Sequence, residues 1–327
     1  MLRGPNVMTA AKRYFEDNPH IKATTRKNWM QTFAMLQRRY PDKRVNELTS
    51  DDLRDFLLKD EYGQPTKLAR GTIVSRRTTL RSFFSWCEYA GILQSDPAST
   101  LVRTVRLRPD PRRAHIWMSE QEISALFGVC RADEEPLRGK RDAILLGFGI
   151  YCGLRRHEIA KVTWGDLNLR AKTLSVLGKG AKLATVPVPA QLVEMLFEWQ
   201  GLMAQGQGAP PARDQRVLCR FMAPGGPLFG GTPRHLSPRW DKGISGDTVY
   251  DVVQHRGREI GVPELTPHDL RRSYAGILED RGVELRAISA VLRHSSISTT
   301  ERYLGDNPKK WQDSVASALS GLGEQSA

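Results

Sequence analysis

Long uninterrupted apolar segments are missing from this chain of 327 residues, although hydrophobic residues make up 40% of it. A membrane-spanning helix needs about 18 to 20 consecutive apolar residues. The longest apolar run, residues 143–152 with its glycines included, is too short and predicts a buried helix. The first residues also lack the apolar core of a signal peptide. We therefore expect no membrane partner and a cytoplasmic location.

Cysteine is scarce, and the four that occur are widely separated: Cys87, Cys130, Cys152 and Cys219. No two of them form a C-x-x-C pair, and the seven histidines contain no H-E-x-x-H pattern. Disulfide scaffolds and structural zinc sites both depend on closely spaced ligands of these types. The sequence therefore predicts reduced thiols and no metal site.

Acidic residues are too few to balance the basic ones. The chain has 49 Lys and Arg against 36 Asp and Glu, which gives a formal net charge of +13. Residues 1–108 are the more basic part, with 20 Lys and Arg against 11 Asp and Glu. Such an excess indicates a polyanionic partner, either nucleic acid or an acidic membrane surface. The absence of long apolar runs favours nucleic acid.

The first third of the sequence predicts helices. Apolar residues recur at helical spacing after Thr24 or Thr25, either of which can cap a helix. Thr49 or Ser50 caps a second helix, whose first turn is acidic, as the helix dipole favours. A third helix is predicted over residues 71–89, with a buried apolar stripe.

Three arginines, Arg70, Arg77 and Arg81, lie on a stripe beside the apolar face of the third predicted helix. They form either an ordinary solvated flank or a set of contacts to nucleic-acid phosphates, which supply affinity without sequence information. The basic charge of the segment, together with the family resemblance given below, favours the phosphate contacts.

Residues 103–114 lack periodicity and hold two prolines and five arginines, which predicts a linker between domains. Arg112 and Arg113 in this segment are further candidate contacts to a nucleic-acid backbone. An ordinary basic loop is the alternative, and the two interpretations are compatible.

The remaining two-thirds predicts helices around a small β-hairpin. Ser119 and Glu122 form a capping box, and strands over residues 173–177 and 183–188 flank a turn. Residues 201–246 are rich in Gly, Pro and Arg, and we expect a long surface excursion with short helical pieces. Further helices are predicted over residues 138–152, 189–200, 248–260, 267–280, 285–292 and 298–303. The fold class is mainly α with a small β-sheet (α+β), in two domains.

Four short motifs follow one another in the second part of the chain. Residues 153–158 read Gly-Leu-Arg-Arg-His-Glu, residues 178–180 Gly-Lys-Gly, residues 268–271 His-Asp-Leu-Arg, and residues 294–303 His-Ser-Ser-Ile-Ser-Thr-Thr-Glu-Arg-Tyr. Arginine suits phosphate oxygens because its planar fork donates parallel hydrogen bonds. A lysine with a shifted pKa can act as a general acid. A tyrosine, whose pKa is ordinarily about 10, becomes a nucleophile only when positioned and deprotonated.

Together the motifs resemble the catalytic set of the tyrosine recombinases, the phage integrase family. The six residues concerned are Arg155, Lys179, His268, Arg271, His294 and Tyr303. Their spacing is also similar, with 24 residues from Arg155 to Lys179, 23 from Arg271 to His294 and 9 from His294 to Tyr303. The resemblance implies attack of a tyrosine on a DNA phosphodiester, a 3′-phosphotyrosine intermediate and a free 5′-OH, with no nucleotide cofactor and no metal.

The resemblance also implies a role for each of these residues. Tyr303 is the nucleophile, Arg155 and Arg271 bind the phosphate, Lys179 protonates the leaving oxygen, His268 helps to accept the tyrosine proton, and His294 bonds a phosphate oxygen. Lys182, three residues from Lys179, is the rival general acid. Tyr151 and Tyr274 are expected to serve in packing.

Glu158 is expected to orient an arginine or the histidine without contacting the substrate itself. Two residues depart from the family pattern. Arg293 stands where the family commonly has glycine before the histidine, and His157 replaces a small residue. Arg293 adds a cation near the expected site and is expected to affect DNA contact or the local turn.

The family resemblance gives the domain organisation. We expect a helical core-type DNA-binding domain over residues 1–105, a basic linker over 106–114, a catalytic domain over 115–307, and a tail helix over 308–327. The tail packs either on a neighbouring protomer or on its own domain. The implied partners are double-stranded DNA attachment or recombination sites, further copies in a tetramer on DNA, and an accessory directionality factor. The implied location is the nucleoid, or the host cytoplasm for a phage protein.

The function expected first is integration or excision of a phage or other mobile element. The predicted core-binding segment starts near residue 1, so we expect no extra arm-site-binding domain before it. A recombinase that resolves chromosome or plasmid dimers is therefore an alternative. A type IB topoisomerase and a non-enzymatic DNA-binding protein are the alternatives from other classes.

Overall fold

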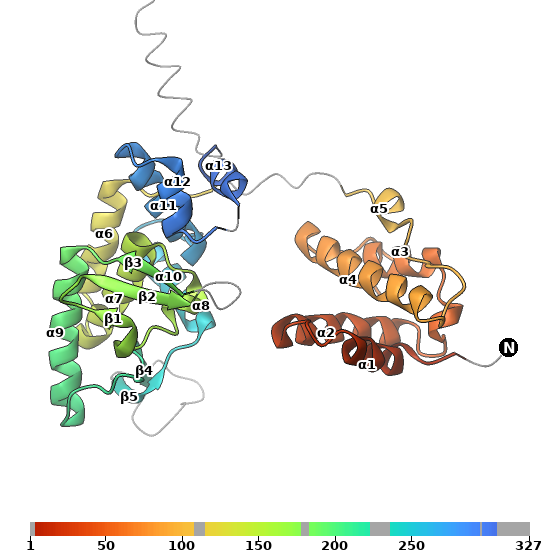
Figure 1. Ribbon diagram of the computed structural model, residues 1–327, viewed down its shortest axis with the longest axis horizontal. Helices are drawn as coiled ribbons and strands as arrows, with labels where there is room; N and C mark the ends of the chain where they lie inside the picture. The colour runs from red at the N-terminus through yellow and green to blue at the C-terminus, as the bar shows by residue number, and fades with distance from the viewer. Residues whose placement is uncertain (1–3, 108–114, 178–182, 223–235, 295, 306–327) are drawn as a thin grey trace, which may run out of the picture. The chain divides into compact units, whose positions relative to one another are not determined.

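The computed structural model describes residues 4–107, 115–177, 183–222, 236–294 and 296–305. The chain divides into two compact units, residues 1–113 and residues 114–327, and each is described by itself (Figure 1). The predicted fold class, mainly α with small antiparallel sheets, is confirmed. No helix within these ranges is both long enough and apolar enough to cross a membrane. All four cysteines are buried and free.

The first unit is helical and is built around aromatic side chains. Its elements are α1 (Val7–Asp17), α2 (Ala23–Arg39), η1 (Val45–Glu47), α3 (Ser50–Leu58), α4 (Arg70–Tyr89) and α5 (Leu101–Thr104). Phe33, Phe83 and Phe84 are fully buried, and the rings of Phe33 and Phe83 lie 4.6 Å apart. Tyr14 packs edge-on against Phe83 and joins its hydroxyl to Ser82 at 2.9 Å. These contacts hold α1, α2 and α4 together.

The helix starts of the first unit agree with the sequence only in part. Thr49 caps α3 as predicted, because its hydroxyl accepts from the backbone N–H of Asp52 at 3.2 Å. The prediction that Thr24 or Thr25 caps α2 is wrong. That helix begins at Ala23, after Lys22, which makes no side-chain cap hydrogen bond. The sequence patterns also did not identify α1.

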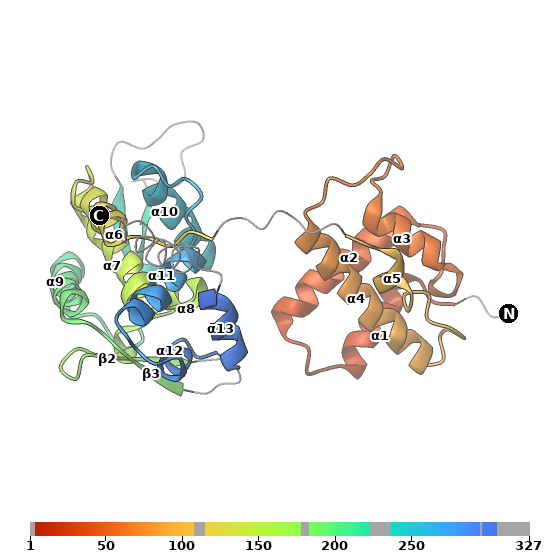
Figure 2. The same ribbon diagram turned by 90° about the horizontal axis from the view of Figure 1, so that it is seen from above.

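The second unit is organised around one buried helix. Its helices are α6 (Glu120–Arg131), α7 (Pro136–Cys152), α8 (Arg156–Ile159), η2 (Trp164–Asp166), α9 (Ala190–Gln207), α10 (Gly246–Glu259), α11 (Pro267–Asp280), α12 (Leu285–Val291) and α13 (Ile297–Gly305). Its strands are β1 (Leu167–Asn168), β2 (Thr173–Leu177), β3 (Leu183–Pro187), β4 (Cys219–Met222) and β5 (Ser237–Gly243). Helix α7 packs against α6, α9 and α11 (Figure 2). Its apolar sequence is therefore explained by burial on all sides.

The strands β1, β2 and β3 form an antiparallel sheet in that order. Leu174 pairs with Val186, and both are fully buried. The two predicted hairpin strands are confirmed, while the turn between them, with Lys179 and Lys182, lies outside the described residues. The predicted capping box of Ser119 and Glu122 is also confirmed at the start of α6.

The expectation for residues 201–246 was wrong. Helix α9 continues through the first part of this segment, and β4 pairs antiparallel with β5. Met203 continues the buried stripe of α9, which includes Trp199, past the predicted end at residue 200. The indole of Trp199 also donates to the Val217 carbonyl at 2.7 Å, which draws the following segment against the helix.

A buried ion network joins α10 to α7 and to the segment after α6. Arg256 is 1% exposed, donates to Asp142 at 3.0 and 2.7 Å, contacts Asp133, and pairs with Glu259 at 3.0 Å. Burial alone would raise the pKa of Asp133, but hydrogen bonds from Arg138 and Arg256 outweigh it and lower the pKa to about 2. The network holds the Asp133 carboxylate ionised within the core.

We expect Arg256→Met to lower the free energy of unfolding by about 3–5 kcal/mol, because buried carboxylates lose their partner. Urea denaturation of the full chain measures this loss. The matched control is Arg281→Met, which removes an exposed pair with Glu120 and should change the free energy by about 1 kcal/mol or less. Equal losses in the two variants would contradict a stabilising network.

Candidate active site

The turn after α7 positions Arg155, the first of the predicted site residues. Gly153 ends the helix in the left-handed conformation with φ of +58°, and a Cβ there would lie 2.5 Å from the Tyr274 ring. Glycine is therefore required for both backbone and packing reasons. The chain then leaves α7 sharply and places Arg155 at the start of α8.

Glu158 holds Arg155 at two points. Its carboxylate accepts from the Arg155 backbone N–H at 2.8 Å and from Nη1 at 2.9 Å. The side chain of Glu158 is 7% exposed, whereas that of Arg155 is 33% exposed and reaches solvent. Burial would raise the pKa of Glu158, but the Arg155 backbone hydrogen bond and the Arg293 charge outweigh it and lower the pKa.

Arg271 connects α11 to two other segments. Its guanidinium donates to the carbonyls of Gly153 and Leu292, at the ends of α7 and α12. Arg271 is only 1% exposed, whereas the side chain of Arg155 is partly exposed to solvent. Leu270 beside it packs against α7 at Gly149, where a Cβ would come within 2.9 Å. The packing of α11 on α7 thus sets the position of this arginine.

His268 and His294 both lie within the field of the two arginines. His268 is exposed at the start of α11, and its pKa is lowered by partial burial first and then by the charge of Arg271. His294 bonds Thr300 Oγ1 through Nδ1 at 2.8 Å. Burial, then the charges of Arg271 and Arg155, lower the pKa of His294 to about 4. Both imidazoles are therefore neutral near pH 7.

Helix α13 lies against α11 and α12 and carries the predicted nucleophile (Figure 1). Leu304 is 3% exposed and packs in a cluster with Tyr274 and Ile288, while Thr300 is fully buried. Tyr303 follows Thr300 by three residues, about 4.5 Å along the helix axis. The side chain of Tyr303 lies outside the described part of the chain.

The structure thus brings Arg155, His268, Arg271 and His294 together from three separate parts of the sequence. Lys179, Arg112 and Arg113 fall in segments that it does not describe. Sequence reasoning missed the bond between Thr300 and His294. The signal for it is the position of Thr300 in the helix that follows the histidine, one turn before the predicted nucleophile.

The model of the family described as "Phage integrase family" matches residues 116–310 of this chain. The chain belongs to the phage integrase family. The resemblance stated from the motifs is confirmed, and the enzyme is a tyrosine recombinase. It is 28% identical over 273 residues to tyrosine recombinase XerC of Mycobacterium sp. (strain JLS), a match that covers 83% of each protein. It is 31% identical over 226 residues to tyrosine recombinase XerC of Rhodospirillum centenum (strain ATCC 51521 / SW), covering 68% of this chain and 59% of that protein.

Among solved structures, this tyrosine recombinase is similar in fold to a lambda integrase dimer bound to a COC′ core site. The TM-score is 0.66 at 15% identity, with 93% of this chain and 78% of that chain covered. At this identity the likeness shows the shared fold alone.

The candidate arginines of the first unit differ in their surroundings. Arg70 and Arg81 are exposed on α4. Arg77 is half-buried and donates through Nη1 to the Val105 carbonyl at 3.0 Å, so part of its bonding capacity serves the fold of the unit.

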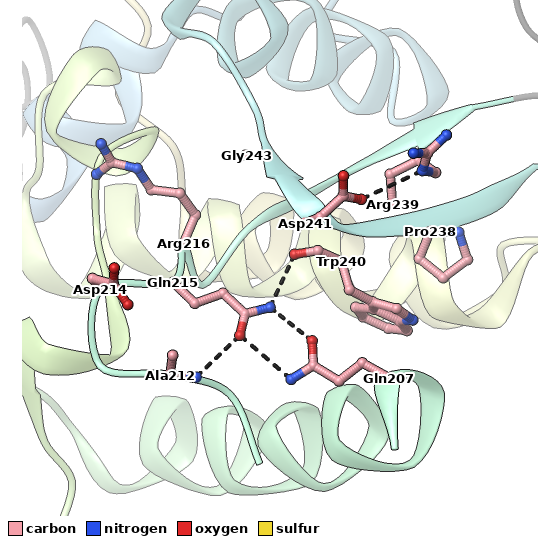
Figure 3. A pocket seen from close by; sticks show the side chains of 10 residues that line it. All are labelled: Gln207, Ala212, Asp214, Gln215, Arg216, Pro238, Arg239, Trp240, Asp241 and Gly243. Atoms are coloured by element: carbon pink, nitrogen blue, oxygen red, sulfur yellow. Dashed lines mark hydrogen bonds and ion pairs between the residues drawn. The ribbon is translucent and has the colours of Figure 1, made fainter. Parts of the chain in front are cut away.

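A cleft of about 690 Å³ lies elsewhere in the recombinase, between the end of α9 and β5. Its lining contains none of the predicted catalytic residues. Figure 3 shows the Gln215 amide at its centre, bonded to Gln207, Ala212 and the Trp240 carbonyl. These polar groups pair with one another, which indicates a structural role.

We expect the His294 ring to titrate near pH 4, because burial and the adjacent arginines disfavour imidazolium. Arg155→Met should raise the titration midpoint, since one of these cations is removed. NMR titration of the histidine ring resonances measures the midpoint in each protein. Arg281→Met is the control, because it removes an exposed cation that is not among the groups acting on His294. An unchanged midpoint in Arg155→Met would contradict the claim that the charge of Arg155 lowers the pKa of His294.

Proposed function

We propose that this recombinase cuts and rejoins double-stranded DNA through a transient 3′-phosphotyrosine bond to Tyr303. The observation that supports the proposal most strongly is the convergence of two arginines and two histidines beside the helix that carries Tyr303. Because these groups come from distant segments, their convergence is a property of the fold.

Stabilisation of the attacked phosphate is assigned to the two arginines. Charge develops on the non-bridging oxygens during attack, and fixed donors stabilise it without reorganisation. Arg155 supplies the solvent-facing guanidinium, held by Glu158. Arg271 supplies a second positive charge from within the unit and holds the surrounding backbone in place.

Proton transfer is assigned to neutral and basic side chains. The Tyr303 oxygen forms the bond to phosphorus, and its proton passes to His268, whose lowered pKa keeps it neutral and able to accept. The bond from phosphorus to the 5′ oxygen breaks, and Lys179 supplies the proton to that oxygen. His294 donates to a non-bridging oxygen. Attack by a 5′-OH reverses these steps, and the chemistry uses neither nucleotide cofactor nor metal.

DNA binding is assigned to both units. The first unit is basic, and the exposed Arg70 and Arg81 on α4 suit contacts to the phosphate backbone. The lambda integrase structure of similar fold is described as bound to a core site. Arg112 and Arg113 of the linker sequence are proposed as further contacts to that backbone. We further propose that the recombinase assembles into a tetramer on DNA. The tail at residues 308–327 then packs on a neighbouring protomer, and an accessory directionality factor acts with the complex.

The biological role proposed first is integration or excision of a phage or mobile element. Resolution of chromosome or plasmid dimers is the second candidate. The observation that favours the second is the likeness to proteins named XerC, one of which covers 83% of this chain. The two roles differ in their DNA substrate, and trapping with both kinds of DNA separates them.

We expect Tyr303→Phe to abolish covalent capture of nicked DNA while leaving DNA binding intact, because only the attacking oxygen is removed. Nicked duplexes trap the adduct, since the short strand with the 5′-OH diffuses away. One set of duplexes comes from the flanks of the gene and a second from elsewhere in the chromosome. SDS-resistant protein–DNA adducts are then counted on gels.

The control for this experiment is Tyr89→Phe, which changes a tyrosine that is 91% exposed in the first unit. The wild type and this control should form the adduct equally. An adduct that persists in Tyr303→Phe would assign another nucleophile. Tight binding without any adduct would favour a non-enzymatic DNA-binding role, and plasmid relaxation without strand exchange would favour topoisomerase activity.

A further inference from the structure

Arg293 adopts a backbone conformation that is unusual for its residue type. Its φ is +56°, in the left-handed region where a side chain is disfavoured. The side chain is nonetheless only 6% exposed. A strained, buried arginine beside a cluster of cations needs a compensating interaction.

That interaction is an ion pair with Glu158. Arg293 Nη2 donates to Glu158 Oε2 at 2.7 Å, and Nη1 donates to the Val291 carbonyl at 3.0 Å. The backbone carbonyl of Arg293 also accepts from Arg155 Nη2 at 3.4 Å. One carboxylate is therefore shared by two guanidiniums, and Arg293 touches Arg155 both directly and through Glu158.

The sharing changes the charge that Arg155 presents. A buried carboxylate paired with a single arginine neutralises it, so that the pair offers an anion little attraction. With Arg293 as a second partner, the triad of Arg155, Glu158 and Arg293 keeps one net positive charge. The carboxylate can then orient Arg155 without cancelling its field.

We infer that Arg293 is a positioning residue, which, through Glu158 and its own carbonyl, fixes the Arg155 guanidinium and preserves its charge for the phosphate. This inference rests on the catalytic role proposed for Arg155. Arg293 is inferred to contact neither the phosphate nor the nucleophile. It acts through its neighbours.

Two substitutions distinguish the effect of the Arg293 side-chain charge from the effect of its backbone conformation. Arg293→Met and Arg293→Gly both remove the cation, but only glycine relieves the left-handed conformation. We expect both to lower the single-turnover rate of adduct formation at saturating DNA by about 10-fold to 100-fold, because a misplaced catalytic group costs rate of this order. DNA affinity should stay close to that of the wild type. Arg293→Lys, which keeps the charge, should recover part of the rate.

A double-mutant cycle tests the route through Glu158. In a Glu158→Gln background, Arg293→Met should lower the rate much less than it does alone, because the carboxylate that couples the two arginines has gone. The matched control is Arg141→Met, which removes another buried arginine of the same unit that pairs with Asp142 at 2.6 Å. It should lower the melting temperature without slowing the reaction of the folded protein.

Several results would overturn the inference. One is a wild-type rate in both Arg293 variants, with only the melting temperature lowered, which would make the residue purely structural. Another is a loss of DNA affinity with an unchanged rate at saturation, which would make it a direct DNA contact. Full additivity in the cycle would also contradict it. If instead Arg155→Met reacts as fast as the wild type, the proposed role of Arg155 fails and this inference fails with it.

Discussion

The hydrogen bonds of the Arg271 guanidinium to the carbonyls of Gly153 and Leu292 are the interaction on which the rest of the site depends. They join α11 to the end of α7 and to the end of α12, so that three segments share one fixed junction. The left-handed turn at Gly153 then directs Arg155 into this junction, and the segment after Leu292 brings His294 to it. A buried arginine therefore organises the site, and a more exposed one faces solvent.

The charge balance of this junction explains its chemical character. Partial burial and the charges of Arg271 and Arg155 lower the pKa values of both histidines, and the charge of Arg293 adds to this effect on His294. Neutral imidazoles in a positive environment can accept or donate a proton while the arginines keep their charge. The Glu158 carboxylate reduces the electrostatic repulsion between Arg155 and Arg293 by bonding both guanidinium groups. The result is a preorganised environment for an anion, which the fold provides before any substrate binds.

The sequence predicted those parts of the fold that depend on local patterns. The hairpin strands, the caps at Thr49 and Ser119, and most helices follow from periodicity and turn chemistry. The continuation of α9 and the β4–β5 pair were missed, because packing of Trp199 outweighs the glycine-rich composition there. The motifs named four residues that the fold brings together, but the pair of Glu158 and Arg293 spans 135 residues. A contact of that range depends on topology, and no local pattern contains it.

A crystal structure of the Tyr303→Phe protein on a duplex that the wild type cleaves tests the central claim most directly. One phosphate should lie within hydrogen-bonding distance of Arg155, His294 and Lys179, with the ring at position 303 in line with its leaving oxygen. Arg271 and Arg293 should keep their bonds to the backbone and to Glu158. Cations that contact different phosphates, with none beside position 303, would contradict a single active site around Tyr303.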